Sequence, residues 1–397
     1  MVNRLALMLV LVTGCADEQL SLFSRVPVDA GSDAGVDAGV DAGMDAGRPF
    51  GVEQVATAFE HTCAIHEGAL YCWGSNTYGE LGTGDLQARN SPTPLDAGTG
   101  WAEVGVGYDA TCARKADGTV WCWGDNTNGR LGQGPGGARR VPGKVILPNA
   151  AVALSMHFQH ACVIGSDATL RCWGMNTEGQ LGLDDGFPGS GDQNLPVLVS
   201  GGGQWRVVSA GQGHTCGIRT DNSLWCWGRN MPPVLGLPGG SPGQIRRPTQ
   251  VGTDTDWMQV VATQSSTCAL KAGGQLWCWG AAYEAGTREI FGIERIGTDG
   301  DWRAVSNETF SVCGIKASNT LWCMGRNVEG QLGTGDTVDQ YTLVQIGSGT
   351  WRSVAVGRFH HCAVDLAGGL FCTGRNEEGQ LGLGDNVRRN VLTPVRF

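Results

Sequence analysis

The sequence predicts an all-β fold, a seven-bladed β-propeller built from four-stranded antiparallel blades. Three observations support this prediction: cysteines recur in seven pairs, glycine and tryptophan are abundant, and charge is sparse. The chain of 397 residues contains 64 Gly and 14 Trp, and 17% of its residues are charged. This composition is typical of a turn-rich β protein, and no long apolar run follows the first dozen residues.

Residues 1–14 predict a lipoprotein-type signal peptide. Arg4 precedes an apolar segment at residues 5–12, which is too short to span a bilayer. The run V-T-G-C that ends at Cys15 resembles the lipobox of bacterial lipoproteins. This resemblance implies cleavage before Cys15, acylation of Cys15 and, because Ala16 follows, sorting to the outer membrane. The alternative is an ordinary secreted protein with one unpaired cysteine.

Residues 15–49 predict the lipidated cysteine and a flexible linker, and residues 50–397 the propeller. In the linker the tripeptide Asp-Ala-Gly begins at Asp29, Asp33, Asp37, Asp41 and Asp45. Small residues and mutually repelling carboxylates cannot form a core, so we expect an extended spacer. A calcium site is the alternative, but the Gly-rich nine-residue calcium repeat is absent from the sequence. Together these features predict a cell-envelope protein that is anchored to a membrane by lipid.

The formal net charge of −10 argues against a nucleic-acid partner. Three arginine pairs occur, but they hold equivalent places in the repeat and form no basic patch in the sequence. They are Arg139-Arg140, Arg246-Arg247 and Arg388-Arg389.

Seven cysteine pairs define the repeat, at steps of 49, 50, 54, 52, 45 and 49 residues. The pairs are Cys63 with Cys72, Cys112 with Cys122, Cys162 with Cys172, Cys216 with Cys226, Cys268 with Cys278, Cys313 with Cys323, and Cys362 with Cys372. A turn signal such as Asp117-Gly118 lies midway between the two cysteines, so each pair should face across an antiparallel hairpin and form a disulfide. Zinc binding is the weaker alternative, because none of the pairs has C-x-x-C spacing. Seven disulfides require an oxidising compartment.

Each unit of about fifty residues holds four short strand signals, which is typical of a propeller blade. The kelch period and the Gly-His of WD repeats fit in part, but the strongest recurring string is G-x-N-x-x-G-[QER]-L-G-x-G. It occurs at Gly74–Gly84, Gly124–Gly134, Gly325–Gly335 and Gly374–Gly384, and in shortened form at Gly174–Gly182. This string resembles the repeat of the regulator of chromosome condensation family. The resemblance extends from residue 51 to residue 397 and implies a seven-bladed propeller.

Copies four and five depart from the string after Trp227-Gly228 and Trp279-Gly280, and a long insertion at residues 184–204 precedes copy four. Propellers bind through loops on their faces, so we expect the irregular segments 184–204 and 230–248 to bind a partner. Drift of unconstrained turns is an equal alternative.

Four histidines lie two residues before the first cysteine of their copy: His61, His160, His214 and His360. A ring of histidines could bind a metal, but we favour packing and hydrogen bonding, because three copies lack the residue. Tryptophans flank the second cysteine at Trp121, Trp123, Trp173, Trp225, Trp227, Trp277, Trp279 and Trp322. We expect these rings to fill the space between blades rather than to form a carbohydrate platform.

No catalytic motif and no phosphate-binding loop emerges from the sequence, so we expect neither an enzyme nor a cofactor. The leading hypothesis is a monomeric, envelope-tethered platform that binds a protein or a glycan through a propeller face. The alternatives are an enzyme inhibitor, as in a secreted relative of the resembling family, and an enzyme with a pocket on one face. We also expect the terminal strand at residues 391–397 to pair with the first blade and close the ring.

Overall fold

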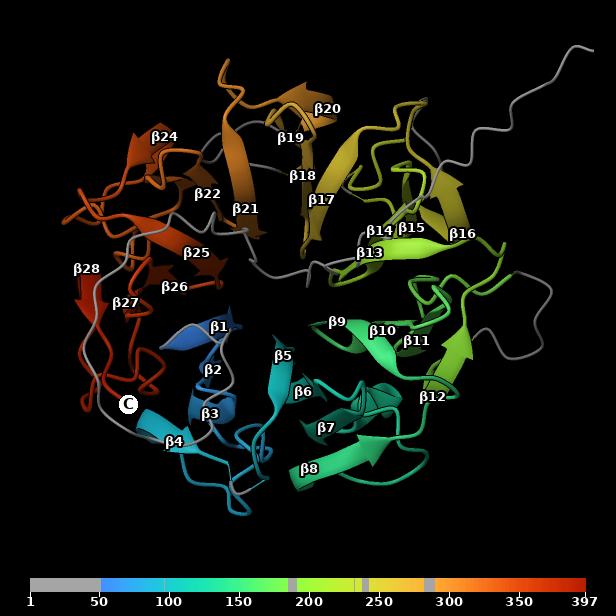
Figure 1. The fold of residues 1–397 in the computed structure, drawn as a ribbon, viewed down its shortest axis with the longest axis horizontal. Helices are drawn as coiled ribbons and strands as arrows, with labels where there is room; N and C mark the ends of the chain where they lie inside the picture. The colour runs from blue at the N-terminus through green and yellow to red at the C-terminus, as the bar shows by residue number, and fades with distance from the viewer. Residues whose placement is uncertain (1–50, 96, 185–190, 232, 238–242, 282–289) are drawn as a thin grey trace, which may run out of the picture.

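The computed structural model describes residues 51–397, except residues 96, 185–190, 232, 238–242 and 282–289. Within them, seven four-stranded antiparallel sheets surround a central axis, and this confirms the predicted propeller (Figure 1). Cys15 and the linker lie outside the described residues. In the part of the chain that is described, no helix has the length and apolar character needed to cross a membrane.

Each blade consists of four strands that are consecutive in the sequence. Blades one and two contain β1 (Val52–Thr57), β2 (His61–His66), β3 (Ala69–Gly74), β4 (Arg89–Pro94), β5 (Trp101–Val106), β6 (Ala110–Lys115), β7 (Val120–Gly124) and β8 (Arg139–Val145). Blades three and four contain β9 (Ala151–His157), β10 (His160–Gly165), β11 (Leu170–Gly174), β12 (Gln193–Leu198), β13 (Trp205–Ala210), β14 (His214–Arg219), β15 (Leu224–Arg229) and β16 (Gln244–Gln250). Blades five to seven contain β17 (Trp257–Ala262), β18 (Ser266–Lys271), β19 (Leu276–Gly280), β20 (Ile290–Arg295), β21 (Trp302–Glu308), β22 (Ser311–Lys316), β23 (Leu321–Gly325), β24 (Gln340–Gln345), β25 (Trp351–Val356), β26 (His360–Asp365), β27 (Leu370–Gly374) and β28 (Arg389–Pro394). A short 3₁₀ turn, η1 (Thr127–Gly129), lies between β7 and β8.

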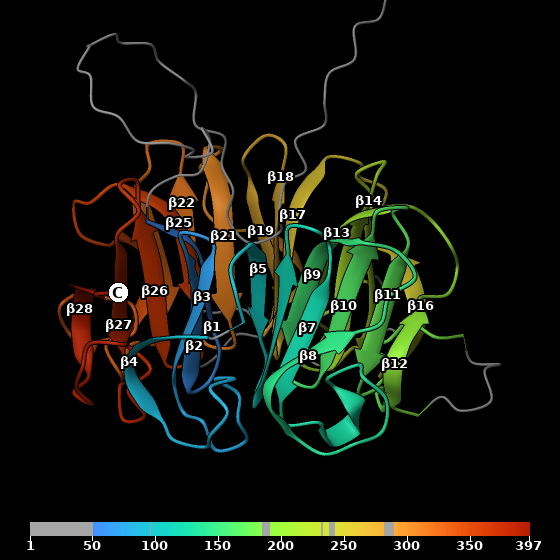
Figure 2. The ribbon, with the colours of Figure 1, turned by 60° about the horizontal axis from the view of Figure 1, so that its bottom comes forward.

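The first strand of each blade lines the axis, and the strands run between two faces of the ring (Figure 2). One face, here called the mouth face, carries the turns between first and second strands and the loops between third and fourth strands. The opposite face carries the hairpins between second and third strands and the connections between blades. The described chain enters the ring at Val52 on this opposite face.

A disulfide joins the second and third strands of every blade, as the cysteine spacing predicts. The bridges join Cys63 to Cys72, Cys112 to Cys122, Cys162 to Cys172, Cys216 to Cys226, Cys268 to Cys278, Cys313 to Cys323, and Cys362 to Cys372. The two cysteines of each bridge lie directly opposite one another in the ladder, as in blade two, and their Cα atoms are 4.1 Å apart in all seven pairs. The predicted pairing of these fourteen cysteines within their own blades is therefore confirmed.

The hairpin of blade one differs slightly from the other six, because one residue fewer separates Cys63 from Cys72. It is closed by Glu67 and Gly68, both with positive φ (52° and 73°), which is the backbone of a two-residue turn. The shorter turn therefore leaves the two cysteines opposite each other, as in the longer hairpins.

The apolar core is divided among the seven seams, where a seam is the interface between two adjacent blades. Every hydrophobic cluster combines residues of two neighbouring blades; Leu81 and Leu95 of blade one, for example, pack with Trp101 and Trp123 of blade two. The tryptophan after the second cysteine is fully buried in five blades, at Trp73, Trp123, Trp173, Trp227 and Trp279. The prediction that these rings fill the space between blades is therefore confirmed for the tryptophans after the second cysteine, whereas Trp121, Trp225, Trp277 and Trp322 before it are only partly buried at the edges of the seam clusters.

The recurring string builds the loop against which this tryptophan packs. In blade one the Asn76 side chain accepts a hydrogen bond from the Leu81 backbone N–H and donates to the carbonyls of Asp85 and Gln87. Gly82 has a φ of +72°, and a Cβ at this position would lie 2.7 Å from Trp123 Nε1 of the next blade. Glycine at this place is therefore required both by the turn and by the close approach of the indole.

The ring does not close by the predicted pairing of the terminal strand with blade one; that prediction is wrong. β28 pairs with β27 of its own blade, and β1 pairs with β2. The outermost strands β4 and β28 do not need a partner chain, because Pro94 and Pro394 blunt their edges. Closure instead depends on contacts between blades seven and one, including a hydrogen bond from the Val52 N–H to the Gly368 carbonyl (2.9 Å) and stacking of Phe397 on His66.

Candidate functional site

Aromatic side chains gather around the axis on the mouth face. The turns that end β1, β5 and β9 supply Phe59, Tyr108 and Phe158. Phe59 and Tyr108 are 4.6 Å apart between ring centroids, Tyr108 and Phe158 are 5.4 Å apart, and Phe59 and Phe158 are 6.1 Å apart. Phe59 is 7% exposed, whereas Tyr108 is 41% exposed. The cluster therefore has a buried base and a solvent-facing edge.

Arginines extend this cluster toward blades six and seven. Arg358 lies over Phe59, Phe359 and Phe310, at 4.8, 5.2 and 5.5 Å from the ring centroids. Two further guanidinium groups stack at the rim: Arg326 is 5.1 Å from the centre of Phe310, and Arg375 is 5.5 Å from that of Phe359. We call these residues, with Tyr108 and Phe158, the axial mouth. Its members are Phe59, Tyr108, Phe158, Phe310, Arg326, Arg358, Phe359 and Arg375.

An ion pair crosses the axis beneath the axial mouth. His157 ends β9 and Glu308 ends β21, and their side chains approach to 2.8 Å (Nε2 to Oε2) although blades three and six are not neighbours. Burial alone would lower the pKa of His157, but the Glu308 carboxylate outweighs it and raises that pKa above its ordinary value. The pKa of Glu308 is lowered: burial opposes ionisation, and the paired imidazolium and hydrogen bonds from Thr309 overcome it. The pair is thus charged and ties opposite sides of the ring together.

A second charged group lies beside the axial mouth in blades one and two. Burial, with the nearby carboxylate of Glu80, raises the pKa of Asp109 to about 7. The buried Arg130 guanidinium pairs with Asp125 at 3.0 Å and partly opposes this shift in Asp109. The mouth face therefore combines exposed aromatic rings, arginines and a carboxyl group that titrates near neutral pH.

The loops between third and fourth strands add exposed apolar side chains to the same face. Tyr78, Met231 and Val328 are 44%, 64% and 41% exposed. Of the irregular segments expected to bind a partner, residues 185–190, 232 and 238–242 lie outside the described residues. The remainder of each segment includes an ordinary outer strand: β12 falls within 184–204, and β16 begins at Gln244. The degenerate string of copy five also falls largely outside, at 282–289.

The four predicted histidines do not form one site around the axis. Each lies in a separate seam between two blades. In each case Nε2 bonds a threonine hydroxyl of the next blade, and that hydroxyl donates to a loop carbonyl of the histidine's own blade. The four relays are His61–Thr111–Glu80, His160–Thr215–Gln180, His214–Thr267–Val234 and His360–Thr62–Gln380.

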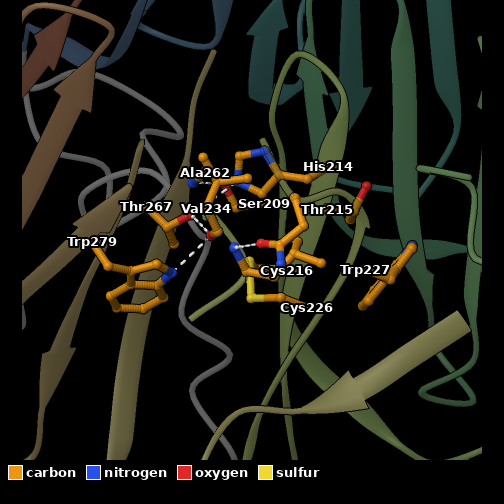
Figure 3. Close-up of a disulfide and its surroundings, with 12 residues drawn as sticks. Ser209, His214, Thr215, Cys216, Cys226, Trp227, Val234, Ala262, Thr267 and Trp279 are labelled. Atoms are coloured by element: carbon orange, nitrogen blue, oxygen red, sulfur yellow. Dashed lines mark hydrogen bonds between the residues drawn. A yellow bond between two sulfur atoms is a disulfide. The ribbon is translucent and has the colours of Figure 1, made fainter. Parts of the chain in front are cut away.

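Figure 3 shows the relay between blades four and five beside the Cys216–Cys226 disulfide. His214 Nε2 lies 2.9 Å from Thr267 Oγ1, which donates to the Val234 carbonyl at 2.8 Å. The Trp279 indole N–H donates to the same carbonyl at 2.7 Å. Burial lowers the pKa of His214 to about 3, so the imidazole is neutral. The structural role that we favoured over a metal site fits this geometry.

One group of potential metal ligands lies close together among the described residues, at Cys313, Cys323 and His361. The two sulfur atoms are joined to each other in the blade-six disulfide, so they are not available as thiolates. His361 Nε2 instead lies 2.9 Å from the Ser311 hydroxyl across the seam between blades six and seven. The group is therefore structural.

The sequence prediction missed the axial mouth. Its signal was present: Phe59, Tyr108, Phe158 and Arg358 each lie two residues before the position that holds the relay histidine in four blades. An aromatic residue in a tight turn is unusual, but only the ring geometry shows that these turns converge on one axis.

Comparisons with known proteins agree with this architecture. Two models of the regulator of chromosome condensation (RCC1) repeat match the chain, one at residues 67–114, 117–164, 318–364 and 367–397 and the other at 101–130, 155–180, 205–230 and 351–380.

Similar solved structures include human WBSCR16, with 19% identity, a TM-score of 0.74 and coverage of 83% of this chain and 94% of that one. Prp20p from Saccharomyces cerevisiae has 19% identity, a TM-score of 0.70 and 86% coverage of both chains. Yeast RCC1 (Prp20) in its complex with Kap60 has 17% identity, a TM-score of 0.72 and coverage of 92% and 91%. At these identities the likeness establishes the fold.

Proposed function

Because this chain belongs to the regulator of chromosome condensation (RCC1) repeat family, we propose that it is a non-enzymatic, envelope-tethered platform that binds a partner protein through the axial mouth. The observation that carries the proposal is the partly exposed cluster of aromatic rings and arginines on one face. Tyrosine and arginine are enriched among residues that dominate binding energy, especially where apolar side chains surround them.

The arginines and aromatic rings of the axial mouth are side chains that bind protein surfaces well. Arg358 is held over three rings, so its guanidinium is oriented before a partner arrives and loses little freedom on binding. Tyr108 packs on the same Phe59 ring and is exposed, and Tyr78 and Met231 are exposed on loops of the same face. A partner with an acidic group near an apolar side chain would complement this arrangement.

The path of the chain supports presentation of the axial mouth away from a membrane. β1 begins at Val52 on the opposite face and runs toward the mouth face, so it ends beside Phe59. A lipid anchor at Cys15 with a linker through residue 49 would therefore join the propeller on the side of the opposite face. The axial mouth would then be left clear of the tether for soluble or surface partners.

Relatives of the same fold bind proteins. The crystal structure of Prp20p was described together with its binding properties to Gsp1p and histones, and yeast RCC1 was solved bound to Kap60. These partners belong to those proteins; for this chain the family supports only the general mode, a propeller that binds protein.

The test compares capture of envelope proteins by the wild-type chain with capture by Tyr108→Ala and Arg358→Ala variants. A matched control is Tyr341→Ala, because Tyr341 is 61% exposed on the outermost strand β24, away from the axis. The captured protein is then purified and its affinity for each variant measured. We expect the two mouth variants to bind roughly 30-fold more weakly and Tyr341→Ala to bind normally. Equal affinity of all four proteins would refute the axial mouth as the binding site.

A further inference from the structure

Blades two, four, five and six share an internal cation site that lies apart from the axial mouth. In each of them a tryptophan begins the first strand, and the residue directly opposite on the second strand is basic. The pairs are Trp101 with Lys115, Trp205 with Arg219, Trp257 with Lys271 and Trp302 with Lys316.

The basic side chain lies over two indole rings in every case. In blade six, Lys316 Nζ is 5.0 Å from the centre of Trp302 and 4.5 Å from that of Trp322. Blades two and five repeat this geometry with Lys115 and Lys271, and blade four repeats it with the Arg219 guanidinium. We call this arrangement the ring cage. A cation over aromatic faces is stabilised by their electron-rich surface, and more so when it is shielded from water.

Blade seven keeps the rings of the cage but reverses the charge. Trp351 begins β25, Phe371 takes the place of the second tryptophan, and the two rings meet edge to face, with their centroids 5.4 Å apart and their planes at 88°. The residue opposite Trp351 is Asp365. Its Oδ1 accepts a hydrogen bond from the Gly369 N–H at 2.8 Å. Among the described residues, no lysine or arginine forms an ion pair with Asp365.

A cavity of about 860 Å³ opens at this place, in the seam between blades six and seven. Blade seven contributes Trp351, Asp365 and Phe371 to its lining, and blade six contributes Gly333, Val344 and Ile346. Blade seven also has Thr373 where five other blades have the buried tryptophan. A Cβ at Gly333 would therefore lie 3.4 Å from the threonine methyl group, whereas a Cβ at Gly82 would lie 2.7 Å from an indole nitrogen. The seam is looser here than between blades that keep the indole.

We propose that this cavity, the blade-seven cage, binds the alkylammonium group of an external ligand against the Trp351 and Phe371 rings that line it and beside the Asp365 carboxylate. Four sister blades fill the equivalent space with their own cation, and blade seven supplies the rings and a counter-charge but no cation. The ammonium would contact the ring faces and pair with Asp365. The cavity is larger than one butylammonium group, so it can also hold the rest of a larger amine. This site does not depend on the proposed function of the axial mouth.

The probe of choice is n-butylammonium, because it is the side chain of lysine that occupies the sister cages. Ligand-observed NMR titration of the full chain, with ionic strength held constant by NaCl, measures its affinity, and 1-butanol is the neutral control. We expect butylammonium to bind about tenfold more tightly than 1-butanol. A parallel titration with choline decides whether the site prefers a primary or a quaternary ammonium. Absence of binding by both cations, or equal binding of 1-butanol, would overturn the proposal.

Two substitutions make the test specific. Asp365→Lys places the lysine of the sister blades in the blade-seven cage and should abolish butylammonium binding, while the cooperative thermal transition is retained. Lys316→Ala empties the blade-six cage and leaves Asp299, whose carboxylate lies 2.8 Å from Lys316 Nζ in the wild type. Adding Lys316→Ala to Asp365→Lys should therefore restore binding at blade six. Undiminished binding by a folded Asp365→Lys variant, or no recovery in a folded double variant, would contradict the cage.

Discussion

Acidification from pH 7 to pH 5 should destabilise the propeller through its buried histidines. Burial lowers the pKa of His61 to about 4 and the pKa values of His160, His214, His360 and His361 to about 3. In the unfolded chain these imidazoles titrate near 6.5. Between the two values the unfolded chain binds protons that the native chain does not. The stability contributed by the neutral imidazoles is therefore present above pH 6.5 and is lost as the pH falls toward 3.

The expected magnitude follows from proton linkage. Each histidine lowers the free energy of unfolding by about 2 kcal/mol between pH 7 and pH 5, so five of them lower it by on the order of 9 kcal/mol. Asp109 acts in the opposite direction, because its raised pKa of about 7 means that the native state gains a proton as the pH falls. Protonation of Asp109 raises the free energy of unfolding by about 2 kcal/mol between pH 7 and pH 5, and the raised pKa of His157 raises it by a smaller amount. A net loss of at least about 5 kcal/mol remains.

Denaturant unfolding under non-reducing conditions at several pH values measures this dependence. The His160→Ser variant isolates one relay, because serine already occupies the equivalent position in blades five and six, at Ser266 and Ser311. We expect its stability to change with pH by about 1.2 kcal/mol per pH unit less than that of the wild type between pH 6 and pH 5. Thr215→Val removes the hydrogen-bond partner of His160 but keeps the imidazole, so it should lower stability and retain the wild-type slope. Equal slopes for wild type and His160→Ser would refute the reasoning.

Three further predictions concern the seams, the terminus and the anchor. Gly82→Ala should lower the free energy of unfolding by about 2 kcal/mol more than Gly100→Ala. Both glycines have positive φ (+72° and +89°), but only Gly82 faces an indole. Equal losses in denaturant unfolding would show that the indole contact is unimportant. Deletion of residues 391–397 removes four of the six residues of β28 and the Phe397–His66 stack, so the melting temperature should fall by several degrees; an unchanged melting curve would argue against closure by these contacts. Cys15→Ser should move the protein from the membrane fraction to the soluble fraction of the envelope, and mass spectrometry of the mature wild-type N-terminus should find an acylated Cys15; a variant that stays with the membrane would contradict lipid anchoring.

Much of the fold could be predicted because the strongest constraints are local. Two cysteines separated by nine or ten residues with a turn signal between them can be bridged only across a tight hairpin, so Cys112 and Cys122 fix the register of β6 and β7. The string that contains Asn76 and Gly82 marks a loop held by its own side-chain hydrogen bonds. Both signals lie within one repeat and can be recognised without knowledge of the ring.

The candidate sites were less predictable because each combines side chains from different repeats. Phe59 and Phe158 come within 6.1 Å only because their turns converge on the axis. The opposition of Trp351 and Asp365 depends on an irregularity in the ladder beside Trp351, which the sequence pattern does not reveal. The terminal strand was assigned wrongly because sequence alone did not show that Pro94 and Pro394 protect the outer edges.

The composition of each blade from four consecutive strands has a topological consequence. No blade borrows a strand from the other end of the chain, so the two ends of the propeller, at Gly51 and Phe397, fall at the same kind of place as every connection between blades. A circular permutant that links these ends and opens the chain at residues 146–150, between β8 and β9, would keep all seven ladders and all seven disulfides. The fold of this ring therefore does not determine between which two blades the propeller must begin and end.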